Sequence, residues 1–180
     1  MSIYLDTAYV AKCYINEPDA PRVRGLVRGL TDLQTSALCI AELACVFQRH
    51  IREKGLNRPQ ASKLRQAFEE DVQNGVWILV PVSNAVLKNV EAAVRNLAPH
   101  VYLRAADAIH LVTARDAGFS EIWSNDRHLL RAALVLRPQG KDRLITAVVP
   151  GPIFGQINVW SAQAQADTPG GGDTTRILAG

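Results

Sequence analysis

Residues 103–114 read LRAADAIHLVTA, and this stretch sets the pattern for the whole chain. Its apolar residues recur at the spacing of an α-helix, not at the alternation of a half-buried strand. One carboxylate, Asp107, lies in this apolar helix, where an unpaired charge is costly to bury. Either an ion pair with Arg104, three residues earlier, or a nearby metal ion would compensate that charge. For Asp107 alone, both interpretations stay open.

Short apolar runs alternate with helical patterns on both sides of this stretch. We expect helices at residues 7–15, 20–30, 37–54, 59–74, 84–97, 104–117 and 127–133. We expect strands at residues 2–5, 33–35, 76–80, 119–123 and 134–136. The run at 76–80 is apolar throughout, which is typical of a parallel strand covered on both faces. The alternation predicts an α/β fold with a central, mainly parallel sheet and helices on both faces.

Three further carboxylates each have two possible roles, one in stabilising the fold and one in a functional site. Asp6 and Asp126 each lie where a strand gives way to a helix, so each either caps a helix or lines the sheet edge that carries sites in α/β folds. Glu42 is the one charged residue in 37–47, a helix expected to be buried on every side, where a distant arginine could pair with it. Four carboxylates meeting at one edge would repel, which predicts a hard divalent cation among them.

Four motifs resemble those of the PIN-domain ribonucleases, most nearly the VapC toxins of bacterial type II toxin–antitoxin pairs. They are YLDTA at 4–8, TSAL at 35–38 leading to Glu42, LRAADAIHL at 103–111 and SNDRHLL at 124–130. The resemblance covers about residues 2–137 and implies a PIN-like three-layer sandwich. The acidic quartet that it implies, holding one or two Mg²⁺ or Mn²⁺ ions, is Asp6, Glu42, Asp107 and Asp126, with Thr7 and Asn125 as supporting residues.

The resemblance also implies an activity and partners. The protein would be a Mg-dependent endoribonuclease, the toxin of a VapBC-like system, which hydrolyses RNA phosphodiesters with metal-activated water. Its partners would be the RNA substrate, a cognate VapB-like antitoxin and a second copy in a homodimer. The alternatives are a PIN nuclease of RNA processing or decay, and a catalytically silent PIN module that binds RNA or protein; the presence of all four acids argues against the silent module. A phosphatase of the haloacid-dehalogenase type would need an Asp where Ala8 stands.

His110 follows Asp107 by one helical turn on the same face. This position is compatible with an acid or base in catalysis. We interpret His110 instead as a packing or supporting residue, because a lone histidine on an apolar face is more often part of the core. It is therefore not included among the expected catalytic residues.

Composition and charge restrict the other classes of protein to which this chain could belong. The chain has 180 residues, 48% hydrophobic and 21% charged, which is ordinary for one folded soluble domain. No apolar run approaches the ~20 residues of a membrane span, and no signal-peptide pattern opens the sequence, so we expect a cytoplasmic protein with no membrane partner. The three cysteines, Cys13, Cys39 and Cys45, fit buried reduced thiols. The net charge of +3 permits a nucleic-acid partner where basic residues cluster, as at 49–65.

The chain changes character towards its C-terminal end. We expect residues 1–145 to form the PIN-like nuclease domain and residues 146–180 to form a C-terminal extension that is largely disordered. The reason is composition, since the extension is rich in glycine and proline and lacks a helical period.

Overall fold

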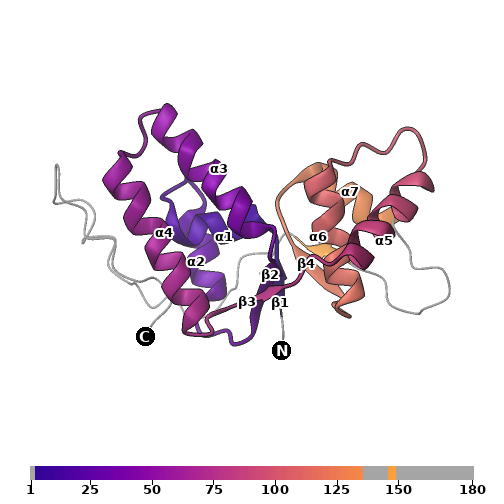
Figure 1. Cartoon of the computed structure of the whole chain (residues 1–180), viewed down its shortest axis with the longest axis horizontal. Helices are drawn as coiled ribbons and strands as arrows, with labels where there is room; N and C mark the ends of the chain where they lie inside the picture. Colours follow the sequence, from indigo (N-terminus) through magenta and orange to yellow (C-terminus); the bar gives the residue numbers. More distant parts are fainter. Residues whose placement is uncertain (1–2, 136–145, 149–180) are drawn as a thin grey trace.

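The computed structural model describes residues 3–135 and 146–148 (Figure 1). The strands are β1 (Ile3–Leu5), β2 (Leu33–Ser36), β3 (Trp77–Val80), β4 (Glu121–Trp123) and β5 (Thr146–Val148). The helices are α1 (Thr7–Tyr14), α2 (Ala20–Val27), α3 (Cys39–Arg52), α4 (Arg58–Gln73), α5 (Asn84–Arg95), α6 (Ala105–Asp116) and α7 (Arg127–Val135). The predicted alternation of strands and helices is confirmed over most of this part of the chain.

The described strands form one sheet in the order β3-β2-β1-β4-β5, and every neighbouring pair is parallel. The chain builds outward from β1 to β3 on one side, then returns to add β4 on the other side of β1. The strand order therefore reverses between β1 and β4. In open parallel sheets, such a reversal leaves a crevice at the carboxyl ends of the two strands, where ligands bind.

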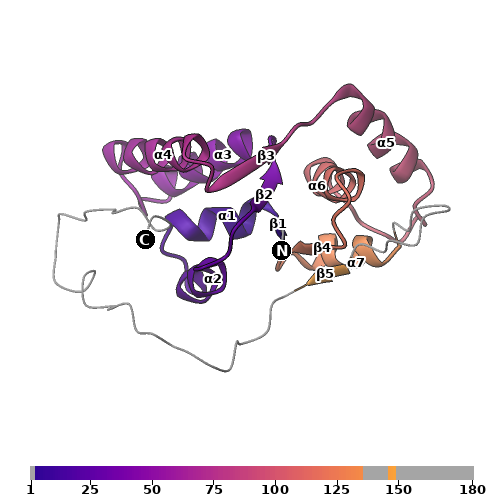
Figure 2. The same ribbon diagram turned by 90° about the horizontal axis from the view of Figure 1, so that it is seen from below.

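Helices cover both faces of the sheet, so the predicted three-layer sandwich is confirmed. Helices α1 to α4 pack on one face, and helices α5 to α7 pack on the other (Figure 2). The alternation of side chains along β1 supplies both cores, because Leu5 belongs to the apolar cluster under α1 to α4 and Tyr4 to the cluster under α6 and α7. Among the helices described, none has the length and hydrophobicity that crossing a membrane requires.

The strand expected at 134–136 is wrong, because α7 continues to Val135. Leu129, Ala132 and Ala133 are all buried, at the spacing of one helical face, so packing on the sheet favours further helix. Leu136 and most of the extension 146–180 lie outside the described residues. Within the extension, β5 pairs with β4 as the fifth strand.

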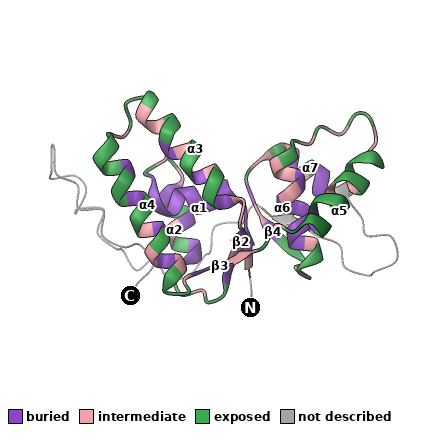
Figure 3. Cartoon of the chain, viewed as in Figure 1, coloured by how far each residue is buried: buried purple, intermediate pink, exposed green. Residues whose placement is uncertain are grey.

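Three expectations about burial are also wrong. Helix α3 is amphipathic, with Leu43 and Phe47 buried but Ile40 55% exposed, because it packs through one face only (Figure 3). Cys45 lies on its outer side and is exposed, whereas Cys13 and Cys39 are buried as expected. Strand β3 is an edge strand, and Ile78 is 41% exposed because the second helical layer does not cover it.

Candidate functional site

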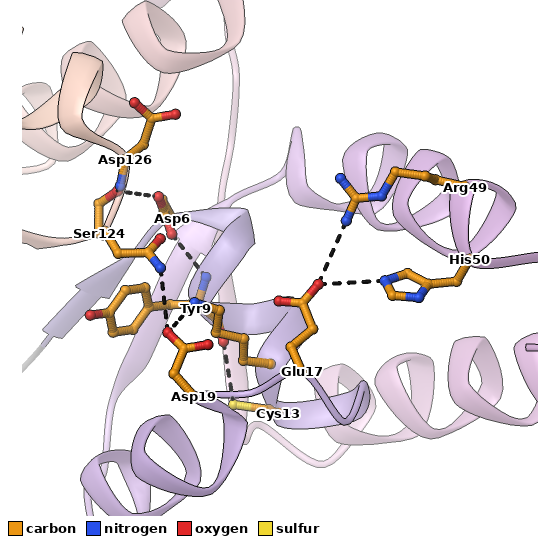
Figure 4. Close-up of polar contacts among 11 residues, drawn as sticks. Asp6, Tyr9, Cys13, Glu17, Asp19, Arg49, His50, Ser124 and Asp126 are labelled. Carbon is orange, nitrogen blue, oxygen red and sulfur yellow. Dashed lines mark hydrogen bonds and ion pairs between the residues drawn. The ribbon is translucent and has the colours of Figure 1, made fainter. Parts of the chain in front are cut away.

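Asp6 lies at the carboxyl end of β1, at the point where the strand order reverses. Its Oδ1 accepts a hydrogen bond from the Tyr9 backbone N–H at 2.9 Å, so Asp6 caps α1 as one of the two interpretations expects. Its Oδ2 accepts a hydrogen bond from the Ser124 hydroxyl, which follows β4 (Figure 4). Burial raises the pKa of Asp6 above its ordinary value, although the contacts with Ser124 and Tyr9 oppose this rise.

Ser124 connects Asp6 to Asp126. Besides donating to Asp6, the Ser124 hydroxyl accepts a hydrogen bond from the Asp126 backbone N–H at 2.9 Å. The Asp126 side chain caps α7, because its Oδ1 accepts from the backbone N–H groups of His128 at 2.7 Å and Leu129 at 3.2 Å. One buried hydroxyl therefore fixes the ends of β1 and β4 relative to each other. The sequence interpretation missed Ser124, although its position immediately after a predicted strand was a usable signal.

Glu42 lies in the first turn of α3 and is held by side chains from two other helices. Thr7 donates a hydrogen bond to its Oε2, and His110 Nε2 lies 2.8 Å from the same oxygen. The partner of Glu42 is thus a histidine, not the distant arginine expected as the alternative. Burial alone would raise the pKa of Glu42, but His110 and Thr7 outweigh it and hold that pKa below its ordinary value.

Tyr4 fixes the orientation of the His110 ring from the other side. The Tyr4 hydroxyl lies 3.0 Å from His110 Nδ1, and burial raises the pKa of Tyr4 so that it remains a protonated donor. With Nδ1 accepting from Tyr4, the proton on Nε2 faces Glu42. His110 is only 2% exposed, and its position agrees with the interpretation of a supporting residue. Tyr4 was missed by the sequence interpretation, because an apolar strand gives no signal for a buried hydroxyl.

Asp107 lies in the first turn of α6, and one of its carboxylate oxygens lacks a hydrogen-bond partner among the described residues. Its Oδ2 is buried and has no hydrogen-bond partner among the described residues. Burial raises the pKa of Asp107, and the negative charge of Asp126 raises it further, while Arg104 opposes both. The guanidinium of Arg104 lies 3.9 Å from Asp126 Oδ2, so the ion pair that forms is with Asp126 rather than with Asp107.

The four carboxylates thus come together as two pairs around the switch point. The charge of Glu42 helps to raise the pKa of Asp6, and the charge of Asp126 helps to raise the pKa of Asp107. Over residues 3–135 and 146–148, no group of three His, Cys, Asp or Glu side chains is close enough to form a ready metal cluster. Asn125 Nδ2 lies 3.5 Å from Asp19 Oδ2, which is not one of the four carboxylates, whereas Thr7 contacts Glu42 directly.

The chemistry of these residues fits a hard divalent cation. All four candidate ligands are carboxylates, the oxygen donors that Mg²⁺ and Mn²⁺ prefer. Asp107 Oδ2 has no hydrogen-bond partner among the described residues, and the pKa values of Asp6 and Asp107 are raised, so the groups around them, Arg104 included, do not fully offset the burial of these carboxylates. A cation beside them would lower those pKa values and supply the missing partner.

The comparison with protein families agrees with this architecture. Residues 3–134 match the model of the PIN domain, which is most of the chain. The chain therefore belongs to the PIN domain family, whose members are generally nucleases and generally use divalent metal ions. None of the curated protein sequences matches this chain.

Proposed function

We propose that this protein is a metal-dependent endoribonuclease and the toxin of a VapBC-like toxin–antitoxin pair. One observation carries the nuclease assignment: two carboxylate pairs meet where the parallel sheet reverses its order, and one buried oxygen of Asp107 has no partner among the described residues. A PIN domain with four carboxylates near that edge, Asp6 among them buried, supports a cation-dependent hydrolase. The toxin assignment is supported by the sequence motifs that resemble VapC.

In this proposal, the carboxylates of Asp6, Glu42, Asp107 and Asp126 hold Mg²⁺ or Mn²⁺. The bound ion supplies a lowered pKa for water and neutralises charge on the phosphate oxygens. Ser124 and the Tyr9 N–H hold the Asp6 carboxylate in place, and His110 and Thr7 hold that of Glu42. Because these partners also oppose protonation, both carboxylates are oriented before an ion or substrate arrives.

RNA is the proposed substrate, and the charge of the surface supports this choice. Exposed basic side chains gather at the turn between α3 and α4 and along α4; they are Arg49, Arg52, Lys54, Arg58, Lys63 and Arg65. Such side chains contact phosphates without regard to base sequence.

The nuclease proposal is tested by incubating the full chain with a mixed RNA pool, in Mg²⁺ or Mn²⁺ and in EDTA. We expect cleavage in either metal and none in EDTA. Asp107→Asn should abolish cleavage, because it removes a ligand charge while keeping the shape of the side chain. Glu69→Gln, which alters an exposed carboxylate on α4, is the matched control and should cleave at the normal rate. Equal cleavage by Asp107→Asn would refute the proposed site.

The proposed partners are a VapB-like antitoxin and a second copy of this chain. Exposed apolar side chains on two helices, Ile40 of α3 with Leu87 and Val94 of α5, support a protein partner, since such residues often mark contact surfaces.

The toxin role is tested by expression in cells. Expression of the wild-type chain should arrest cell growth, and expression of Asp107→Asn should not. Normal growth with an active nuclease would favour RNA processing or decay over the toxin role. Light scattering of the purified chain tests the homodimer directly.

A further inference from the structure

Tyr102 lies in the connection between α5 and α6, two residues before Arg104, the N-cap of α6. Its side chain is 58% exposed, the largest exposed fraction among the big hydrophobic side chains of the described residues. Packing therefore explains less than half of this aromatic surface. An exposed tyrosine at the entrance to helix α6 needs another explanation, because α6 carries Asp107 in its first turn.

The surroundings of Tyr102 connect it to the carboxylates. Its ring packs edge-to-face against His128, with the ring centroids 4.7 Å apart. The guanidinium of Arg104 lies 5.9 Å from the Tyr102 ring centroid and also 3.9 Å from Asp126 Oδ2. His128 is held in turn by its backbone N–H, which donates to Asp126 Oδ1 at 2.7 Å. Two aromatic rings and one cation thus border the Asp107–Asp126 pair.

This combination is the chemistry that binds an unpaired nucleotide. Tyrosine and histidine rings stack on nucleobases that have left a helix, and arginine contacts the backbone phosphate beside them. A base in a duplex has no free face to offer, so such a subsite selects single-stranded RNA. The contact is sequence-tolerant, because every base has an aromatic face.

We infer that Tyr102, supported by His128, forms a stacking subsite for one unpaired nucleobase next to the phosphodiester that the acidic site attacks, with Arg104 contacting the adjacent phosphate. This inference rests on the proposed nuclease function and adds to it the residues that hold one base beside the cut. It also makes Tyr102 a positioning residue rather than a catalytic one, because it touches a base and not the reacting phosphate.

The test measures binding in EDTA, so that its outcome does not depend on cleavage. The full chain is titrated into a fluorescein-labelled 12-nucleotide single-stranded RNA, and anisotropy gives the dissociation constant. Tyr102→Ala should weaken binding about tenfold, as expected for the loss of one stacked base. Tyr102→Phe should bind within about twofold of wild type, since the ring face is kept. Leu87→Ala, which removes a comparably exposed apolar side chain on α5, should have no effect.

A second arm identifies the contact as a stacked base. A strand of the same length is prepared without bases, and wild type should lose about tenfold more affinity on this abasic strand than Tyr102→Ala loses, because only wild type has the stacking ring. A duplex of the same sequence should bind both proteins equally. Unchanged affinity of Tyr102→Ala for the single strand would overturn the inference, and so would an equal loss of affinity by the two proteins on the abasic strand. If Tyr102→Ala weakens binding but wild type never cleaves RNA in Mg²⁺, the nuclease proposal fails while the stacking subsite stands.

Discussion

Replacing Ser124 by alanine tests the connection between β1 and β4. Ser124 is fully buried; its hydroxyl donates to Asp6 Oδ2 and accepts from the Asp126 N–H at 2.9 Å. Alanine removes both contacts while deleting a single oxygen atom, so packing changes little. The loss of stability then reports the two hydrogen bonds.

The expected loss follows from the burial and the charge of Asp6. A hydrogen bond to a charged group contributes about 1.5–3 kcal/mol and a neutral one about 1 kcal/mol. Asp6 is 5% exposed, so water cannot readily replace Ser124 as its donor. We therefore expect Ser124→Ala to lower the free energy of unfolding by about 3 kcal/mol at pH 7.5. For a chain of this size, that corresponds to a fall in Tm of roughly 6–12 °C.

The effect should depend on pH, because Ser124 stabilises the ionised form of Asp6. Burial raises the folded-state pKa of Asp6 above 3.8, and the Ser124 hydrogen bond opposes that rise. A carboxyl with a raised folded pKa costs stability above that pKa, and this cost disappears as the pH falls towards the unfolded value. Ser124→Ala enlarges the cost at neutral pH only. Near pH 4 its effect should therefore shrink to about 1 kcal/mol, the share of the neutral hydrogen bond.

Urea denaturation followed by circular dichroism at pH 7.5 and pH 4.0 measures both values. Ser83→Ala is the control, because Ser83 caps α5 through the Val86 N–H at 3.3 Å and no carboxylate takes part in that contact. It should cost about 1 kcal/mol at both pH values. An equal loss for Ser124→Ala at the two pH values would refute the argument, since Asp6 would then not be the ionised partner.

Three further predictions concern the carboxylates and their cation. His110→Gln should lower the free energy of unfolding by about 2 kcal/mol, because Tyr4 and Glu42 lose a buried partner; urea denaturation measures this, and an unchanged midpoint would contradict it. Asp107→Asn should raise the free energy of unfolding at pH 7, because the folded pKa of Asp107 is raised. Urea denaturation should show this gain vanish as the pH falls towards 3.8. A destabilised Asp107→Asn would instead favour a structural ion pair. Mg²⁺ at ten times its dissociation constant should stabilise wild type and Glu69→Gln by about 1.4 kcal/mol but should not stabilise Asp107→Asn. Thermal melts with Mg²⁺ and with EDTA measure this stabilisation. Equal shifts in Tm for all three proteins would place the ion elsewhere.

The order of helices and strands could be predicted from the sequence because local pattern decides it. The caps Asp6 and Ser83 and the apolar period around Asp107 each act within a few residues. How much of each helix or strand is covered by neighbouring elements could not be predicted in the same way. The apolar runs at 37–47 and 76–80 indicated burial on all sides, but α3 packs through one face and β3 lies at an edge.

The meeting place of the acids was predictable, whereas the contacts that hold them were not. Asp6 and Asp126 follow neighbouring parallel strands, and topology alone brings such positions to one edge. The partner of Glu42 comes from 68 residues away, and no spacing rule connects it to His110. Asn125 was expected as a supporting residue from the resemblance alone. Its side chain lies near Asp19, and this could not be predicted because sequence position does not fix the rotamer of an exposed loop residue.

The return of the chain from β3 to β4 has a consequence for biosynthesis. The first half of the sheet, with Asp6 and Glu42, is complete at Val80, while Asp107 and Asp126 arrive only with α6 and α7. At about 5–20 residues per second, the ribosome needs roughly 6–24 s to make the segment from Asp6 to Asp126. For about half of that time, a nascent chain thus carries only two of the four proposed ligand carboxylates, and it cannot assemble the proposed site before Asp126 is made. A split of the polypeptide after β3 would divide the carboxylates two and two, so that neither fragment holds the complete set until the halves associate.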